Sequence, residues 1–119
     1  MKFIKFTMLF TALFLTGCGS SGPKLQNLDE VCAHLENKGF VSGPKETVAG
    51  YQLVGAINGI RYSDSKVEIY EYEGTAPEKV IFIVELVPTA TNGRFSMYVP
   101  ETYEAKDNLV KEFKTLNVE

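Results

Sequence analysis

Apolar residues between positions 27 and 40 recur at the spacing of one helix face. Asn27 is suited to cap the start of such a helix, and Glu30 follows three residues later, as in a capping box. Gly39 stands where a left-handed residue commonly ends a helix, so that Phe40 can fold back onto the last turn. The pattern therefore predicts a helix over 27–40 with a buried face formed by Leu28, Val31, Cys32 and Leu35.

The middle of the chain has the apolar, β-branched and aromatic composition of strands. Gly55 and Gly59 weaken the first of these strands and indicate a bulge or a close backbone contact. Asn92-Gly93 is the strongest hairpin-turn pair in the chain and predicts that a returning strand follows it. After a loop at 41–50, we expect extended segments at 51–62, 66–73, 79–87 and 94–99.

The third extended segment allows two interpretations. Thr75-Ala76-Pro77-Glu78 resembles a helix start with proline inside the first turn. The run from Val80 to Val84 is instead typical of a buried strand. We favour a strand over 79–87 because β-branched side chains lose rotamer freedom in a helix, and the helix stays as the alternative.

A second helix is predicted over 100–116, because Leu109, Phe113 and Leu116 form an apolar stripe there. The expected order is therefore one helix, four strands and one helix. This order favours the α+β class, with a four-stranded antiparallel meander between an N-terminal and a C-terminal helix. We expect the helices to cover one sheet face and water to reach part of the other. Residues 27–119 would form a single domain.

The first 17 residues have the three parts of a signal peptide. Lys2 and Lys5 give a positive start, an apolar run follows from Phe6 to Thr16, and Gly17 is a small residue at the end. The run has about 11 residues, well short of the roughly 20 that a membrane-spanning helix needs. We therefore expect residues 1–17 to be removed from the mature protein.

Leu15-Thr16-Gly17-Cys18 resembles the lipobox of bacterial lipoproteins. The resemblance implies cleavage between Gly17 and Cys18 and attachment of lipid to the Cys18 thiol. Two or three acyl chains would then anchor the protein stably in the bilayer, where one would not. Residues 18–26 would form a flexible tether. The resemblance also implies a location: by the usual sorting rule for such lipoproteins, Gly rather than Asp at residue 19 sends the protein to the outer membrane of a two-membrane host, and otherwise it lies on the outer face of the cell membrane.

The net charge argues against nucleic acid as a partner. The chain has 12 Lys and Arg against 15 Asp and Glu, a net charge of −3. Removal of Lys2 and Lys5 with the signal peptide makes the mature chain more acidic still. An acidic protein is repelled by phosphate backbones, and no polybasic patch is present to bind anionic lipid.

The sequence contains no evident catalytic set, metal site or cofactor-binding loop. His34 is the only histidine and lacks partners at ligand spacing, so we expect a structural or surface role. Cys32 is expected to act as a small buried hydrophobe, and no disulfide is expected because Cys18 is committed to lipid. Glu68, Glu71 and Glu73 crowd one segment, which is more typical of a solvated strand face than of acid–base or calcium chemistry.

Tyrosine and glutamate on one strand also suit protein recognition, because tyrosine offers a large contact area at a low entropic cost. The predicted contact residues are Arg61, Tyr62, Glu68, Tyr70 and Tyr72. The function expected from these features is that of a non-enzymatic protein-binding module anchored at the cell envelope, with an envelope or phage protein as its partner.

Two alternatives remain open. The segments Ala56-Ile57-Asn58-Gly59 and Asn92-Gly93-Arg94-Phe95, with the Lys66 to Tyr72 strand between them, resemble parts of small α+β surface lipoproteins of bacteria and prophages. Some phage-encoded members act in superinfection exclusion, which implies an inhibitor or exclusion factor as the first alternative. A metal-dependent enzyme that uses the glutamate cluster is the second.

Overall fold

Residues 24–81 and 83–118 are described by a computed structural model of the chain. This part of the chain forms two α-helices, a short 3-10 helix, a five-stranded sheet and a two-stranded sheet. The fold is therefore α+β, as predicted. Within the same residues, no helix combines the length and the apolar character needed to cross a membrane.

The first helix, α1 (Leu28–Asn37), begins and ends through local capping interactions. The Asn27 side chain accepts a hydrogen bond from the amide of Glu30 at 3.0 Å. At the other end Gly39 has a φ of 80°, and the Phe40 amide donates to the carbonyl oxygen of Leu35 at 2.9 Å. Both predicted ends are confirmed, because each depends only on neighbouring residues.

The main sheet is antiparallel, with the order β1-β2-β3-β7-β6. Its strands are β1 (Lys45–Thr47), β2 (Asn58–Tyr62), β3 (Glu68–Glu71), β7 (Phe95–Tyr98) and β6 (Ala90–Asn92). The predicted four-stranded meander is thus wrong in detail. Two of its strands were not predicted: β1 lies at one edge, in the segment expected to be a loop, and β6 forms the other edge, where the strand at 79–87 was expected. A hairpin forms near the predicted turn and the returning strand is confirmed, but the turn is one residue later than Asn92-Gly93: Asn92 pairs with Phe95, and Gly93, with a φ of 58°, and Arg94 form the turn.

The segment predicted as one strand over 51–62 is divided. Its first part is the 3-10 helix η2 (Tyr51–Val54), and only β2 is extended. Gly55 follows η2 with a φ of 84°, a left-handed conformation that glycine adopts without strain. Glycine therefore ends the 3-10 turn here, where a continuous strand was expected.

The segment at 79–87 is not a single strand either. It folds back on itself as β4 (Val80–Ile81) and β5 (Glu85–Leu86), which pair only with each other. No helix forms in the described part of this segment, so the favoured extended conformation is confirmed and its continuity is not. The two strands satisfy each other's backbone groups, whereas a single isolated strand would leave them unpaired.

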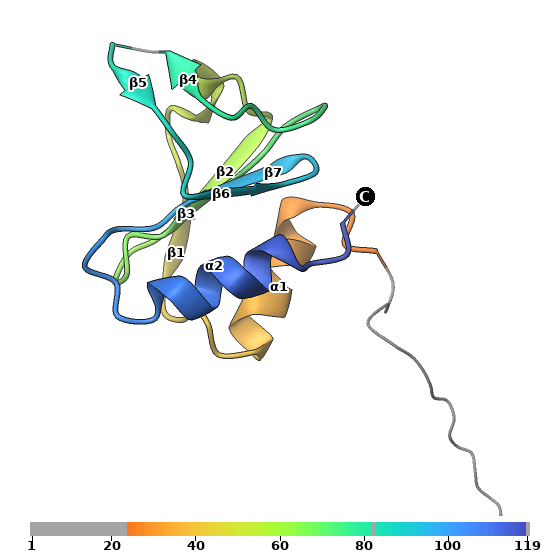
Figure 1. Cartoon of the computed structure of the whole chain (residues 1–119), viewed down its shortest axis with the longest axis vertical. Helices are drawn as coiled ribbons and strands as arrows, with labels where there is room; N and C mark the ends of the chain where they lie inside the picture. The colour runs from red at the N-terminus through yellow and green to blue at the C-terminus, as the bar shows by residue number, and fades with distance from the viewer. Residues whose placement is uncertain (1–23, 82, 119) are drawn as a thin grey trace, which may run out of the picture.

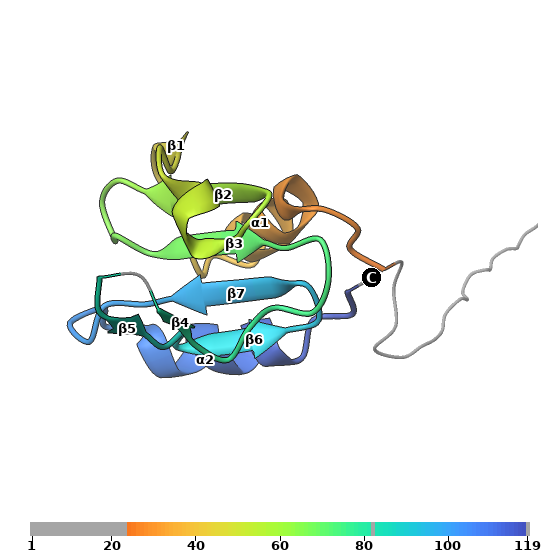
Figure 2. The same cartoon turned by 90° about the horizontal axis from the view of Figure 1, so that it is seen from above.

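Both helices lie on one face of the main sheet, and η2 and the β4–β5 hairpin lie on the other (Figure 1). The large hydrophobic core lies between the sheet and the helices and includes Phe95, Met97 and Phe113. A smaller cluster on the opposite face includes Tyr70, Tyr72, Ala56 and Ala76. Figure 2 shows the strands side by side, with the start of the described chain at one end and the β4–β5 hairpin toward the other.

The second helix, α2 (Lys106–Lys114), is shorter than the predicted range of 100–116. Turns occupy the residues before it, and no side chain caps its N-terminus. The edge strand β6 contacts its C-terminus, where the side-chain Nδ2 of Asn92 donates to the carbonyl oxygens of Phe113 at 3.0 Å and Leu116 at 2.9 Å. Helix α2 is thereby fixed in position against β6.

Candidate protein-contact surface

The alternation of side chains along β2 and β3 divides the predicted contact residues between the two faces of the sheet. Tyr62 belongs to the large core, on the same face as the helices. Tyr70 and Tyr72 belong to the smaller cluster on the opposite face. Because neighbouring residues of a strand point to opposite faces, Arg61 and Glu68 share the face of Tyr70. The five residues therefore do not form one surface.

Tyr62 has a structural position. Its side chain is fully buried, and its hydroxyl donates a hydrogen bond to Glu36 Oε2 at 2.7 Å. The same carboxylate pairs with Lys45 of β1, so that α1 and the sheet edge are tied together. Burial, together with Cys32 and Glu36 nearby, raises the pKa of Tyr62 far above its usual value. Tyr62 is not available to a partner, which corrects its assignment as a contact residue.

The face away from the helices carries a group of polar and aromatic side chains, named here the tyrosine face: Arg61, Glu68, Tyr70, Tyr72, Ser96 and Tyr98. The Tyr70 hydroxyl donates to Glu68 Oε1 at 2.8 Å, and Arg61 Nε lies 3.6 Å from Glu68 Oε2. The Tyr70 and Tyr98 rings meet edge to face, with centroids 5.7 Å apart and planes at 86°. This arrangement orders the face across β2, β3 and β7.

The segment around η2 covers much of the tyrosine face. Val48, Tyr51 and Val54 pack against the cluster that contains Tyr70 and Tyr72. Gly59 permits this packing, because a Cβ there would lie 2.8 Å from Tyr70 Cδ2 and 3.1 Å from Tyr51 Cβ. The close backbone contact that the sequence indicated at Gly59 is therefore confirmed.

As a result, the predicted tyrosines are largely inaccessible. Tyr70 is 6% exposed and Tyr72 is 5% exposed. Within the described residues, the buried polar atoms without a hydrogen bond of normal geometry all lie on this face: Arg61 Nε, Tyr72 Oη, Ser96 Oγ and Tyr98 Oη. Burial raises the pKa of Tyr98 to about 12 and also raises that of Tyr72. Parts of Arg61, Glu68 and Tyr98 remain at the surface.

The accessible apolar surface lies instead on the segment 79–87, named here the apolar hairpin. Four of its aliphatic side chains are more than half exposed: Ile81 at 68%, Ile83 at 83%, Val84 at 61% and Val87 at 62%. Val80 and Leu86 are half-buried beneath them. Figure 1 shows this hairpin standing away from the sheet on the side opposite the helices. A group of exposed aliphatic residues of this kind commonly marks a contact site.

Sequence reasoning assigned these residues to a buried strand and so missed their exposure. A short apolar run looks the same whether the fold or a partner covers it. One signal was present in the charged residues that flank the run, Glu78, Lys79 and Glu85. Charges so close to both strands are difficult to bury, which argues for a strand pair at the surface.

The glutamate cluster is dispersed by the fold. Glu71 lies at the helix side of the sheet, where Arg94 Nη1 donates to it at 2.9 Å and the Leu28 amide donates at 3.0 Å. Glu68 lies on the tyrosine face, and Glu73 is exposed beyond the strand. In the part of the chain that the structure covers, no group of three or more potential ligands could hold a metal ion.

His34 and Cys32 both have structural surroundings. His34 Nε2 lies 2.9 Å from Glu112 Oε2, a contact that joins α1 to α2. Cys32 is 1% exposed, and burial raises the pKa of its thiol. A buried thiol with a raised pKa has little thiolate at neutral pH, which fits the role of a small hydrophobe.

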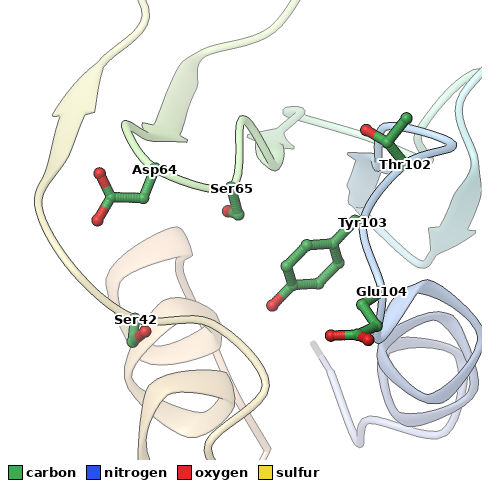
Figure 3. Close-up of a pocket in the computed structure, with 6 residues that line it drawn as sticks. All are labelled: Ser42, Asp64, Ser65, Thr102, Tyr103 and Glu104. Atoms are coloured by element: carbon green, nitrogen blue, oxygen red, sulfur yellow. The ribbon is translucent and has the colours of Figure 1, made fainter.

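A pocket of about 380 Å³ opens between the turn after β2 and the segment before α2 (Figure 3). Figure 3 shows Asp64 and Ser65 on one side and Tyr103 and Glu104 on the other. The Tyr103 hydroxyl is already engaged, because it donates to the carbonyl oxygen of Phe40 at 2.6 Å. The residues that line this pocket supply two carboxylates and several hydroxyl groups, but no cationic side chain and no nucleophile next to a base. This lining does not indicate a catalytic site.

Gly17 and Cys18, the predicted cleavage and lipidation residues, lie outside the described residues. Comparison with known proteins adds no further information: no family model, no curated protein and no solved structure matches the chain significantly. The candidate surface therefore depends on the geometry of this chain alone.

Proposed function

We propose that this protein is a lipid-anchored, non-enzymatic protein-binding module of the cell envelope, with the apolar hairpin as its contact surface. The observation that carries the proposal is the exposure of Ile81, Ile83, Val84 and Val87 on one small hairpin. Burial of each such side chain contributes about 1.5–3 kcal/mol. The isolated domain forgoes this stabilisation, and a protein partner that covers the hairpin would recover it.

The proposed anchor is compatible with this surface. Lipid on Cys18 would be joined to the domain by the short Gly- and Ser-containing tether. The described chain starts beside the helices, and the hairpin lies on the far side of the sheet (Figure 1, Figure 2). A protein anchored through Cys18 can therefore turn its hairpin away from its own bilayer toward an envelope or phage protein.

Site-specific photo-crosslinking in the host tests the contact surface. A photoreactive amino acid is placed at Ile83 in the full-length protein, and the matched control carries it at Asn108, an exposed position on α2. We expect a discrete protein adduct from position 83 and none from position 108. Equal or absent labelling at both positions would reject the hairpin as the contact surface.

Metabolic labelling with palmitate tests the anchor separately. We expect label in the full-length protein and none in the Cys18→Ala variant, which should also leave the membrane fraction. A wild-type protein that takes up no label, or a Cys18→Ala variant that stays membrane-bound, would contradict lipid anchoring through Cys18. Neither result depends on the identity of the partner.

A further inference from the structure

The outward face of the apolar hairpin carries four exposed side chains at the corners of a rectangle. Ile81 pairs with Glu85 across the two strands, and Val80 pairs with Leu86. Continuing this register by one pair places Lys79 opposite Val87. Residues directly opposite each other share a face, and so do residues two apart in a strand. The side chains on the outward face are therefore Lys79, Ile81, Glu85 and Val87. The other face holds the half-buried Val80 and Leu86.

The four side chains alternate in character around this rectangle. Ile81 and Val87 occupy one diagonal, and both are largely exposed aliphatic residues. Lys79 and Glu85 occupy the other diagonal and carry opposite charges. The sides of this arrangement are about 5 Å across the strands and about 7 Å along them, so a two-fold rotation about one diagonal brings each of the other two corners close to the position of its opposite.

This pattern is complementary to itself. A two-fold axis along the Ile81–Val87 diagonal would bring each Lys79 over Glu85 of another copy, and each Ile81 over its own equivalent. Such an arrangement is an isologous interface, in which the same patch is used on both sides. With sides of about 5 and 7 Å, the strands of the two hairpins would cross at about 70°, a steep crossing rather than the aligned packing of two sheets. We infer that the apolar hairpin binds the same hairpin of a second copy of this chain.

The charges of Lys79 and Glu85 favour a second copy of the chain over a bilayer as the partner of the hairpin. Lys79 and Glu85 are exposed, and among the described residues neither takes part in an ion pair. Each could therefore pair across the interface without breaking an existing contact. Glu78 and Glu85 would instead face anionic headgroups if the hairpin were inserted in a membrane, which is unfavourable.

The interface between the two hairpins would be small, so we expect the dimer to form only where the local concentration of the protein is high. Stable complexes bury about 800 Å² on each partner, more than four side chains and a turn provide. The dimer would therefore be weak in dilute solution. Confinement of two anchored copies in one membrane raises their effective concentration and favours the contact there. The inference thus rests on the lipid-anchored binding function proposed above, and names its partner.

The position of Ile81 on the proposed axis provides a direct test. In an Ile81→Cys variant of the full-length protein, the two introduced thiols would face each other and could be joined by mild oxidation with copper phenanthroline in host membranes. Cys32 is buried and should not react. The matched control is Asn108→Cys, an exposed position on α2 remote from the hairpin. We expect a disulfide-linked homodimer from position 81 and little from position 108.

Charge reversal then tests the orientation. In the Ile81→Cys background, Glu85→Lys or Lys79→Glu should lower the dimer yield about tenfold, because each reversal turns two symmetric attractions into repulsions. Combining Glu85→Lys with Lys79→Glu should restore the yield. All of these positions are exposed, and an unchanged circular dichroism spectrum would show that the variants fold.

The outcomes separate this inference from the proposed function. Equal dimer yields at positions 81 and 108, or a double reversal that restores nothing, would overturn the two-fold contact. Photo-adducts from position 83 that contain only a different protein would also overturn it and would leave the proposed binding function intact. Photo-adducts from position 83 that contain lipid and no protein, without a dimer from position 81, would indicate membrane insertion and reject both.

Discussion

The side-chain amide of Asn92 donates a hydrogen bond to the carbonyl oxygen of Phe113 across 3.0 Å, although 21 residues separate them in the chain. The same Nδ2 atom also lies within hydrogen-bond distance of the carbonyl oxygens of Lys114 and Leu116. Helix C-termini leave carbonyl groups without internal partners, and here an edge strand supplies the donor. The fold of the sheet and the end of α2 are therefore coupled through one side chain.

Replacing that donor with an acceptor should destabilise the domain. In Asn92→Asp a carboxylate would face carbonyl oxygens at the negative end of a helix dipole. We expect the free energy of unfolding at pH 7 to fall by about 2–3 kcal/mol, measured by urea denaturation. Much of the loss should be recovered at acidic pH, where the carboxyl group is protonated and can donate. Asn108→Asp, on the exposed side of α2, is the control and should change little.

The buried ion pair of Glu71 and Arg94 should behave as a unit. Glu71 is 8% exposed and accepts from Arg94 and from the Leu28 amide, so removing the cation leaves a buried carboxylate uncompensated. We expect Arg94→Met to lower the free energy of unfolding by about 3–5 kcal/mol. Adding Glu71→Gln to that variant should recover part of the loss in a double-mutant cycle. Purely additive effects would show that the two side chains are not coupled.

A methyl group at Gly59 should disturb the packing beneath η2. Gly59→Ala would place its Cβ 2.8 Å from the Tyr70 ring, with the cover of the tyrosine face directly above. We expect a loss of about 1–3 kcal/mol in thermal or chemical unfolding, as for other overpacked sites. Gly74→Ala is the matched control, because no atom lies within 4 Å of a Cβ there. Gly74→Ala should be neutral or slightly stabilising, because alanine lowers the conformational entropy of the unfolded chain. Similar losses for both variants would show that the contact with Tyr70 is not the cause.

The tyrosine face should make the domain sensitive to alkali. Burial raises the pKa of Tyr98 in the folded protein to about 12, above its usual value of 10. Between these values the folded state holds a proton that the unfolded state has lost, so the unfolding free energy should fall as pH rises from about 10 toward about 12. Below about pH 10 this contribution is constant. Phenolate absorbance and denaturant unfolding, followed over the same pH series, measure the two sides of this linkage.

Tyr98→Phe provides the matching substitution. The Tyr98 hydroxyl is buried without a hydrogen-bond partner among the described residues, so removing it should leave stability at pH 7 unchanged or raise it by about 1 kcal/mol. The variant should also lose less stability in alkali than the wild type does. A marked loss of stability at pH 7 would indicate that the hydroxyl has a partner, such as a bound water molecule.

Local signals in the sequence were sufficient for some of the elements. Asn27, Glu30 and Gly39 define both ends of α1 through contacts within a few residues. Asn92-Gly93 likewise locates the turn between β6 and β7 to within one residue. The division of the segment 51–62 into η2 and β2 was not predicted. Tyr51 and Val54 of η2 pack against the cluster that contains Tyr70 and Tyr72, a contact between distant residues that no local pattern shows.

The sequence by itself determined the α+β class, the first helix, the presence of a hairpin turn next to Asn92-Gly93 and the residue types available for chemistry, because these follow from short-range periodicity, capping and composition. Tertiary structure decided which face each side chain occupies and what covers it. Tyr62 on β2 and Tyr70 on β3 are the same residue type on neighbouring strands, yet the alternation along each strand places them on opposite faces of the sheet. Ile81, Ile83 and Val84 belong to a run typical of a buried strand, yet they are exposed, because β4 and β5 pair with each other and not with the five-stranded sheet. Burial depends on the whole packing arrangement, which no local pattern specifies.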